Sequence, residues 1–499
     1  MELPNPFSIY FLTFLFLFIL TKLAKKICSN TTTKLPPGPK TLPLIGNTHQ
    51  ILGSMPHHCF RNLANKYGPL MHLKLGDVSN IIVTSPEIAK QIMKTHDLNF
   101  SNRSNLVLSN IISYNGTDIA FAPYGHYWRL LRKICTVELL TVKRVQSFRS
   151  IREEEVLELV KTIGASEGSI VNLSGRIFLV TYGIVARAAF GKRSRYQKIF
   201  IAAVEEQLKL LGGFSVADLY PNSKVVQMMS RTKAKLKKVH AQIDGILQDI
   251  LDEHRNRKRK GEVEDLVDVL LKFQQDKDSE YPLTEDNIKA VILDIFAGGG
   301  ETSSSIVEWA MSEMIKNPKL MEEAQDEIRS VFDRQGYVDE TKLHQLTFLK
   351  SIVKETLRLH PSVPFLLPRQ NREKCQINGY ELPENTRIVI NAWAIARDPN
   401  YWAEPETFKP ERYLNSSIDF RGTDFEFIPF GAGRRMCPGI VFAMPNMELP
   451  LAQLLYHFDW KLPNGMKNEE LDMSESFRFT LRRKNELCLS PITRRPIPQ

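Results

Sequence analysis

Apolar side chains recur every three or four positions along most of this chain, which is the spacing of amphipathic helices. The clearest stretch covers residues 286–317, where isoleucine and valine fall on one face, Thr284 is a possible N-cap and Pro318 follows the end. The same spacing predicts further helices over residues 151–163, 233–254, 318–332 and 349–360.

Strand-like runs are few and short by comparison. Residues 81–84 (IIVT) and 387–390 (RIVI) are rich in β-branched side chains and predict two strands. No internal repeat or low-complexity segment divides the chain, so residues 42–499 are expected to form one continuous body. The pattern as a whole predicts a mainly α fold with a smaller β-sheet region.

The N-terminal segment has a different pattern. Residues 7–20 are almost wholly apolar and are followed by three lysines, which predicts a transmembrane anchor over residues 1–27 with the rest of the chain in the cytosol. A cleaved secretory peptide is the alternative, but no basic residue precedes the run and no small-residue cleavage site follows it. Residues 28–41, basic and rich in proline, predict a stiff hinge.

Composition narrows the choice of function only slightly. A 499-residue chain with 43% hydrophobic residues is neither disordered nor a small disulfide-stapled protein. Its net charge of +10 suits nucleic acid, anionic lipid or an acidic protein partner. The basic run at residues 255–260 lacks interleaved aromatic residues, so we interpret it as a solvated helix end and predict no nucleic-acid binding. The six cysteines include no Cys-x-x-Cys pair, which favours a reducing compartment.

One cysteine stands in a sequence that suggests a chemical role. Residues 430–439 read FGAGRRMCPG, a glycine-rich turn that delivers Cys437 to the start of a predicted helix. Backbone N–H groups, the positive helix end and the side chains of Arg434 and Arg435 are expected to stabilise a thiolate, which can ligate iron. A buried, inert cysteine is the alternative.

The order Phe430, Gly433, Arg435, Cys437 and Gly439 resembles the haem-ligand signature of the cytochrome P-450 haem-thiolate monooxygenases at every specified position. The resemblance implies the single-domain fold of that family and a haem b cofactor. It also implies that Cys437 is the axial ligand of the iron, that Arg435 pairs with a haem propionate, that Phe430 shields the sulfur and that Gly439 belongs to the cofactor-binding loop. An anionic sulfur ligand favours O–O cleavage.

Three consecutive glycines, residues 298–300, interrupt the longest predicted helix, at a cost of about 1 kcal/mol each relative to alanine. A flat ligand pressed against the backbone near Gly298, with local widening of the helix, is one reason for them, and a helix crossing through small residues is the other. Glu301 and Thr302 favour the first, because an acid beside a hydroxyl can relay protons. This segment is similar to the family's proton-delivery motif, which implies catalytic roles for both.

Glu355 and Arg358 lie three residues apart on one predicted helix face. Alone, such a pair is ordinarily an exposed ion pair of small energetic value. Together with Arg412 it resembles the buried Glu-Arg-Arg network that lies behind the haem in this family, which implies a structural role.

Trp128 and Arg132 are four residues apart and share a predicted helical face. An amphipathic surface helix is the plain interpretation, but the family uses such a pair to hold haem propionates, and Arg369 resembles a further propionate contact. Arg129 and Lys133 point elsewhere and are expected to belong to a basic face for an acidic electron donor. One departure is Pro445, eight residues after Cys437, which predicts a kink or break in the helix and weaker haem retention.

The resemblance covers nearly the whole chain and is closest to the membrane-bound plant branch that oxidises terpenoids and alkaloids. It implies hydroxylation or epoxidation of a sesquiterpene or diterpene with dioxygen, and an indole alkaloid, triterpenoid or flavonoid is the alternative substrate. No nucleotide-binding glycine fingerprint is present, so electrons are expected from a separate protein. The resemblance implies that this protein is an NADPH-dependent flavoprotein reductase and that the setting is the endoplasmic reticulum membrane. The apolar substrate wall is implied at Phe121, Ala297, Val363, Phe365, Phe477 and Phe479.

Rival classes are a haem-thiolate isomerase or lyase and a non-enzymatic haem protein. The acid–alcohol pair at Glu301 and Thr302 disfavours the first class, because its members commonly lack this pair. A non-enzymatic haem carrier or sensor is disfavoured further.

Overall fold

The structure is a computed structural model. It describes residues 34–498 apart from residue 105, residues 192–195, residue 213 and residues 258–263 and 276–281. The predicted membrane anchor, residues 1–27, and the first part of the predicted hinge lie outside the described residues.

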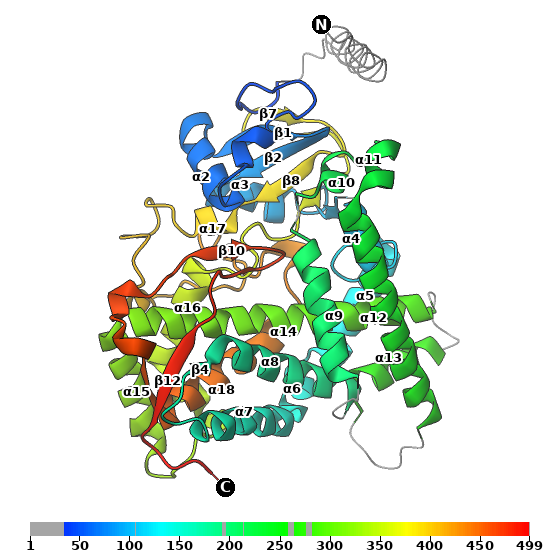
Figure 1. The fold of residues 1–499 in the computed structure, drawn as a ribbon. Coiled ribbons are helices and arrows are strands. Elements are labelled where there is room, and N and C mark those ends of the chain that lie inside the picture. Colours follow the sequence, from blue (N-terminus) through cyan, green and yellow to red (C-terminus); the bar gives the residue numbers. More distant parts are fainter. Residues whose placement is uncertain are drawn as a thin grey trace, which may run out of the picture.

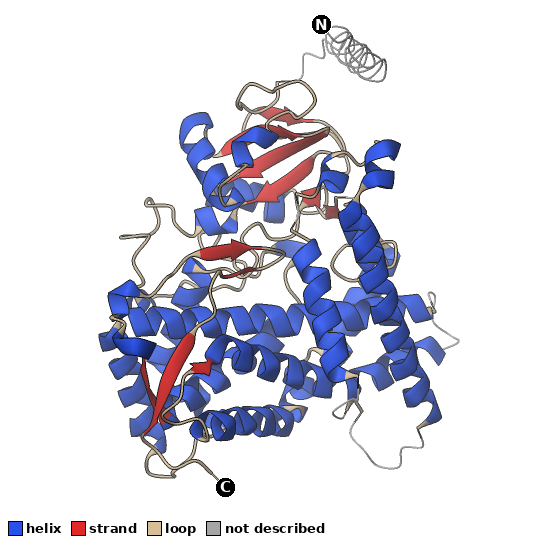
Figure 2. Ribbon diagram, viewed as in Figure 1, coloured by secondary structure: helices blue, strands red, loops and turns tan. Residues whose placement is uncertain are grey.

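Helices make up most of the described chain (Figure 2). They are α2 (Pro56–Tyr67), α3 (Pro86–Lys90), α4 (Val107–Ile112), α5 (His126–Ile134), α6 (Val142–Ser147), α7 (Arg149–Gly164), α8 (Leu173–Phe190), α9 (Gln197–Leu210), α10 (Val216–Leu219), α11 (Lys224–Met229), α12 (Arg231–Asn256), α13 (Leu266–Gln275), α14 (Glu285–Lys316), α15 (Pro318–Phe332), α16 (Thr347–Leu359), α17 (Ala392–Ile395) and α18 (Ile440–His457). The helices predicted from periodicity are confirmed as α7, α12, α14, α15 and α16.

The strands are short and form several small sheets. They are β1 (Leu70–Leu75), β2 (Val78–Val83), β3 (Asn102–Arg103), β4 (Val171–Asn172), β5 (Arg369–Gln370), β6 (Cys375–Ile377), β7 (Tyr380–Leu382), β8 (Arg387–Ile390), β9 (Phe458–Lys461), β10 (Glu475–Phe477), β11 (Leu481–Arg483) and β12 (Cys488–Thr493). The largest sheet has the order β1-β2-β8-β5-β3 and lies at one end of the molecule (Figure 1). Its two strands predicted from sequence, β2 and β8, pair in parallel with Ile81 opposite Ile388.

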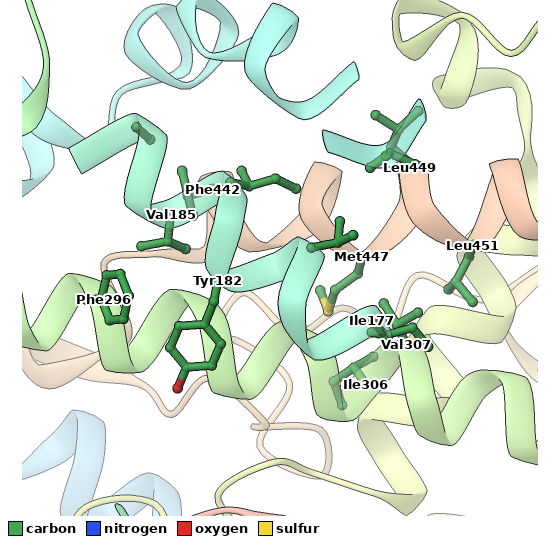
Figure 3. Packing of buried hydrophobic residues seen from close by; sticks show 14 of the residues in the cluster. Ile177, Tyr182, Val185, Phe296, Ile306, Val307, Phe442, Met447, Leu449 and Leu451 are labelled. Atoms are coloured by element: carbon green, nitrogen blue, oxygen red, sulfur yellow. The ribbon is translucent and has the colours of Figure 1, made fainter. Parts of the chain in front are cut away.

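Helix α14 crosses the helical part of the molecule (Figure 1). It contributes many residues to the largest hydrophobic core. Its N-terminus carries a capping box, in which Thr284 and Asn287 each accept from the other's backbone N–H. Helices α8 and α18 pack beside it, and Figure 3 shows Tyr182 and Val185 of α8 directed toward α14. Because these helices share one hydrophobic core, the helical part of the chain forms a single body.

One helix in the described part of the chain, α8, is long and apolar enough to cross a membrane. Two-thirds of it (67%) is buried inside the fold, where it packs against α7 and α14. Its apolar composition is therefore explained by the protein core, since an interior helix is apolar on all sides.

The predicted break at Pro445 is wrong. Helix α18 runs through Pro445 and also through Pro450, and the N–H of Ala443 still bonds to the carbonyl of Gly439 over 2.8 Å. A proline removes one helical hydrogen bond, but α18 packs against α7, α14, α15 and α16, and this packing favours continuation of the helix.

Candidate active site

A cavity of about 300 Å³ lies beside the glycine-containing stretch of α14. Its other walls come from the segments that precede α5 and β5 and from the loop that leads into α18, and its lining is mostly apolar. The residues predicted from sequence that line it are Phe121, Trp128, Arg132, Ala297, Gly298, Thr302, Val363, Arg369, Phe430, Arg435, Cys437, Gly439 and Phe479.

Cys437 lies just before α18 and borders this cavity. Its N–H donates to the carbonyl of Phe430 over 3.0 Å, which closes the loop, and the N–H of Gly439 donates to Cys437 Sγ over 3.3 Å. Gly433 has a φ of +69°, and a Cβ atom there would lie 2.1 Å from the carbonyl oxygen of Met93. Only glycine therefore allows the loop to take this path.

Burial raises the pKa of the Cys437 thiol, and the N–H of Gly439 and the charge of Arg132 oppose the rise only in part. Arg132 is thus the charge that lowers the pKa of Cys437, whereas the Arg434 side chain is 51% exposed and Arg435 donates to backbone carbonyls. A thiolate at this position needs a bound metal ion, since coordination displaces the thiol proton.

Four arginines border the same cavity from different elements: Arg103 on β3, Arg132 on α5, Arg369 on β5 and Arg435 in the Cys437 loop. Within the part of the chain that the structure describes, only Arg369 forms an ion pair, with a carboxylate oxygen at 2.9 Å. The other three donate to backbone carbonyls. Burial, together with the neighbouring charge of Arg369, lowers the pKa of Arg435 to about 9.

These groups fit a flat, dianionic ligand such as haem. Arg435 Nη1 is buried and has no hydrogen-bond partner among the described residues, so a carboxylate placed there would satisfy it. A Cβ atom on Gly298 would meet no atom within 4 Å and would project into open space. Bare backbone at Gly298 therefore leaves room for a planar group that also reaches Cys437.

Trp128 borders the cavity but points its N–H elsewhere. Trp128 Nε1 donates to the carbonyl of Ile119 over 3.0 Å, and the Arg435 guanidinium lies 4.2 Å from the centre of the Trp128 ring. This arrangement places Trp128 as a support for Arg435. Arg103 belongs to the same edge of the cavity and was not predicted, because no sequence motif marks the two-residue strand that carries it.

The two explanations for the glycine run apply to different glycines. A Cβ atom on Gly299 would lie 3.0 Å from Val185, and one on Gly300 would lie 2.6 Å from the ring of Tyr182. Both neighbours come from α8, which crosses α14 at this point (Figure 3). Gly298 thus leaves open space beside the cavity, whereas Gly299 and Gly300 allow two helices to approach. The expected local widening is absent, because α14 continues as one α-helix through this segment.

The two residues of the acid–alcohol pair have different surroundings. Thr302 borders the cavity, and its hydroxyl donates to the carbonyl of Gly298 over 2.5 Å. Glu301 is only 3% exposed and does not line the cavity. Its carboxylate accepts from Thr480 over 2.8 Å and pairs with Arg482 at 3.1 Å. Thr302 therefore faces the cavity, and Glu301 is held behind it by residues that no motif predicts.

The structure brings Glu355, Arg358 and Arg412 together. Arg358 donates to both oxygens of Glu355, over 2.7 and 2.8 Å, and Arg412 Nε donates to Glu355 Oε1 over 3.1 Å. The remaining N–H groups of Arg358 donate to three backbone carbonyls. Arg358 and Glu355 are fully buried, so the network joins α16 to the segment around Arg412 without an unpaired charge.

The six residues of the implied substrate wall fall into two groups. Phe121, Val363 and Phe479 line the main cavity and also a smaller adjoining pocket of about 80 Å³. Phe365 and Phe477 line only the adjoining pocket, and Ala297 lines only the main one.

Comparison with known proteins decides the family. A family model described as cytochrome P450 matches residues 36–489. The chain is a cytochrome P-450. It is 70% identical to cytochrome P450 71D10 of Glycine max, over 99% of this chain and all of that protein. It is 52% identical to tabersonine 16-hydroxylase 2 of Catharanthus roseus, over 97% of each chain.

The fold agrees with this assignment. A zebra fish cytochrome P450 solved with abiraterone superposes with a TM-score of 0.76 at 25% identity, over 88% of this chain and 99% of that one. As a cytochrome P-450, the protein is a haem monooxygenase and an oxidoreductase. Its family uses haem with an axial cysteine thiolate, dioxygen, and electrons that come from NADPH through a reductase.

Proposed function

We propose that Cys437 is the axial ligand of the haem iron and that Arg132, Arg369 and Arg435 hold the propionates. The position of Cys437 at the cavity supports the first assignment, and the unpartnered Nη1 of Arg435 supports the second. The N–H of Gly439, which donates to the sulfur, would withdraw electron density from the ligand and tune the iron.

When bound, thiolate-ligated haem supplies the activation of dioxygen. This chain contributes a hydroxyl at the cavity wall, because Thr302 borders the cavity and can pass a proton into it. Glu301 is the adjacent acid that can restore that proton. To do so, it has to leave Thr480 and Arg482, which hold its carboxylate behind α14.

The proposed reaction is hydroxylation or epoxidation of a neutral, apolar plant metabolite, with a sesquiterpene or diterpene as the first choice. The observation that carries this choice is the state of Asp294, the carboxylate that lines the cavity. Its Oδ2 atom accepts two backbone N–H groups, and the side chain also bonds to Asp118. No carboxylate among the described lining residues is therefore free to receive a protonated amine.

An indole alkaloid is the second candidate. It is favoured by two relatives from Catharanthus roseus, each 52% identical to this chain, whose names describe them as a tabersonine hydroxylase and a tabersonine epoxidase. A weakly basic alkaloid could enter as the neutral amine, for which an apolar lining is sufficient.

The setting we propose is the endoplasmic reticulum membrane. Residues 1–27 are the anchor, residues 28–41 the hinge, and residues 42–499 the cytosolic, haem-containing domain. Arg129 and Lys133 are exposed on α5, whereas Arg132 of the same helix borders the cavity. The two exposed cations can meet an acidic flavoprotein reductase while the helix also contacts the haem edge.

The ligand assignment is tested on the full-length protein in microsomes. The ferrous–carbonyl spectrum is expected to show the red-shifted Soret band of a thiolate ligand in the wild type and to lose it in Cys437→Ser. Cys135→Ser is the matched control, because Cys135 is buried and also borders the cavity. Retention of the band in Cys437→Ser contradicts the assignment.

The substrate is tested by incubating the same microsomes with NADPH, a reductase and labelled dioxygen. We expect one labelled oxygen atom in the product of a sesquiterpene or diterpene. Turnover of the alkaloid set alone would replace the terpenoid proposal by the second candidate. Conversion without label would indicate an isomerase or lyase.

A further inference from the structure

Two carboxyl groups, Asp118 and Asp294, meet at the edge of the cavity. Asp118 lies in the segment before α5 and is 1% exposed. Asp294 lies on α14, one turn before Gly298, and borders the cavity. The two side chains hydrogen-bond to each other. The reaction outlined above uses neither of them.

The pair accepts four consecutive backbone N–H groups. Asp294 Oδ2 accepts those of residues 119–120 over 2.9 and 3.0 Å. Asp118 Oδ1 accepts those of residues 121–122 over 2.8 and 3.0 Å. The segment contains no helix or strand of its own, so the two carboxyl groups take the place of a regular backbone partner.

The carbonyl groups of the same segment accept from the side chains at the arginine-lined edge of the cavity. Ile119 accepts from Trp128 Nε1 over 3.0 Å. Ala120 accepts from Arg103 Nε over 2.9 Å. The carbonyl of residue 122 accepts from Arg435 Nη2 over 2.5 Å. The segment therefore transmits the position of the carboxyl pair to three side chains at the edge of the haem site.

The contact between the two carboxyl groups requires a proton. Two ionised carboxylates repel each other and have no hydrogen to share. Asp118 Oδ2 is buried and finds no N–H or O–H donor in the described part of the chain. If Asp118 Oδ2 carries the proton and donates it to Asp294, this atom has a hydrogen-bond partner and the two carboxyl groups no longer repel each other.

We propose that Asp118 and Asp294 share one proton and act as positioning residues, which hold residues 119–122 and through them Trp128, Arg103 and Arg435. The inference rests on the haem-edge role proposed above for Arg435. It goes beyond that role because it assigns the control of this edge to a pair of acids outside the residues proposed to hold the haem.

The proton also makes the position of the edge depend on pH. Burial raises the pKa of Asp294 to about 6. Burial and the charge of Asp294 raise the pKa of Asp118 well above its ordinary value. A carboxyl whose pKa is raised in the folded protein stabilises it at low pH and loses this effect as pH rises through the raised value. Alkaline pH is therefore expected to loosen the segment.

Other titratable and charged groups also face the pair. Arg103 and Arg435 approach Asp118 from β3 and from the Cys437 loop. Tyr127 of α5 and Cys135 approach Asp294. Burial raises the pKa of Tyr127 and raises that of Cys135 to about 12, so both stay neutral while the pair titrates.

The test measures transfer of haem from the full-length holoprotein to excess apomyoglobin between about pH 7 and about pH 10. Asp118→Asn keeps the oxygen that accepts residues 121–122 and replaces the shared proton by a permanent amide N–H. Asp118→Leu removes both the accepting oxygen and the shared proton. Glu448→Gln is the matched control, because burial raises the pKa of Glu448 to about 7 and this residue does not line the cavity.

The rate of haem loss is expected to rise about tenfold over this range in the wild type and in Glu448→Gln. In Asp118→Asn the rate should stay constant and close to the wild-type rate at pH 7. Asp118→Leu is expected to lose haem about tenfold faster already at pH 7. The same pH dependence in Asp118→Asn as in the wild type overturns the proposal, and so does a flat wild-type profile. The ferrous–carbonyl band, recorded for each variant, reports ligation by Cys437 separately.

Discussion

Thr480 donates its hydroxyl hydrogen to Glu301 Oε1 over 2.8 Å, from the turn between β10 and β11. Arg482 reaches the same oxygen at 3.1 Å, and the hydroxyl of Tyr182 lies 3.4 Å from the other oxygen. The acid of the acid–alcohol pair is thus held by a strand and a helix that are remote from it in sequence. This contact links the stability of the C-terminal hairpin to the residue proposed to supply protons.

Removing the cation of this network is expected to destabilise the fold. Arg482→Met leaves Glu301 buried without its cation and should lower the free energy of unfolding by about 2 kcal/mol. In the Glu301→Gln background the same change should cost less than about 1 kcal/mol, because no buried charge is left unpaired. Chemical denaturation of the four proteins gives the coupling, and equal losses in both backgrounds would show that the two residues act independently.

Thr302 is expected to matter for coupling and hardly at all for folding. Thr302→Val removes the hydroxyl at the cavity wall but keeps the shape, so product formed per NADPH oxidised should fall about tenfold or more while the ferrous–carbonyl spectrum is unchanged. Thr302→Ser is the matched control and should stay near the wild type. Parallel measurement of NADPH, product and peroxide separates the two, and a well-coupled Thr302→Val protein would rule out the role.

The glycine run supplies a second matched pair. Gly300→Ala places a Cβ atom 2.6 Å from the Tyr182 ring, which has to move, so we expect a loss of about 1–3 kcal/mol in stability. Gly298→Ala meets open space and should gain up to about 1 kcal/mol through helix propensity while reducing haem occupancy. Thermal unfolding and haem content measure these effects, and similar behaviour of both variants would contradict the separation of roles.

Much of the fold could be predicted from periodicity, because long amphipathic helices such as α14 and α15 carry their signal locally. Helix α8 carries none of this kind, since it is buried on several sides and its apolar residues show no single face. The continuation of α18 through Pro445 also could not be predicted from the local sequence. A proline removes one hydrogen bond, but packing from four other helices decides whether the helix continues.

The site divides in the same way. Residues in compact motifs, such as Cys437 and Thr302, were found because several specific side chains stand close together in sequence. Arg103 and Thr480 lie in segments without a motif, and only the fold brings them to the cavity edge and to Glu301. The rise in the pKa of the Cys437 thiol could not be predicted from the motif, because burial depends on the whole fold.

The contact between α2 and β10 is expected to weaken in acid. His57 Nε2 lies 2.9 Å from Glu475 Oε2 and the ring is fully buried. Burial lowers the pKa of His57, and the nearby carboxylate offsets this only in part. A histidine whose folded pKa is lowered stabilises the protein above its ordinary pKa of about 6.5, and this contribution is lost as pH falls through and below that value.

His57→Gln tests this expectation, because an amide can still donate to Glu475 but does not titrate. Unfolding free energies measured between about pH 8 and about pH 5 should fall in the wild type by about 1.4 kcal/mol for each unit by which the pKa is lowered, and should stay nearly level in this variant. His58→Gln is the matched control, since His58 bonds to the same carboxylate but is 45% exposed. An unchanged slope in His57→Gln would assign the acid sensitivity elsewhere.

Gln207 of α9 offers a test of what the cavity recognises. Its side chain is 1% exposed, borders the cavity, and has an Oε1 atom with no hydrogen-bond donor among the described residues. A buried acceptor of this kind gains a partner when a bound molecule brings a hydroxyl group, and it disfavours a molecule that brings only carbon.

Gln207→Leu should therefore weaken the binding of a hydroxylated terpene about fivefold to tenfold, and the parent hydrocarbon should bind equally well or more tightly. Spectral titration with such a pair measures both affinities, and Leu208→Met, which changes the same wall without a polar atom, should shift the two ligands equally. Equal shifts in Gln207→Leu would mean that this residue does not contact the substrate hydroxyl.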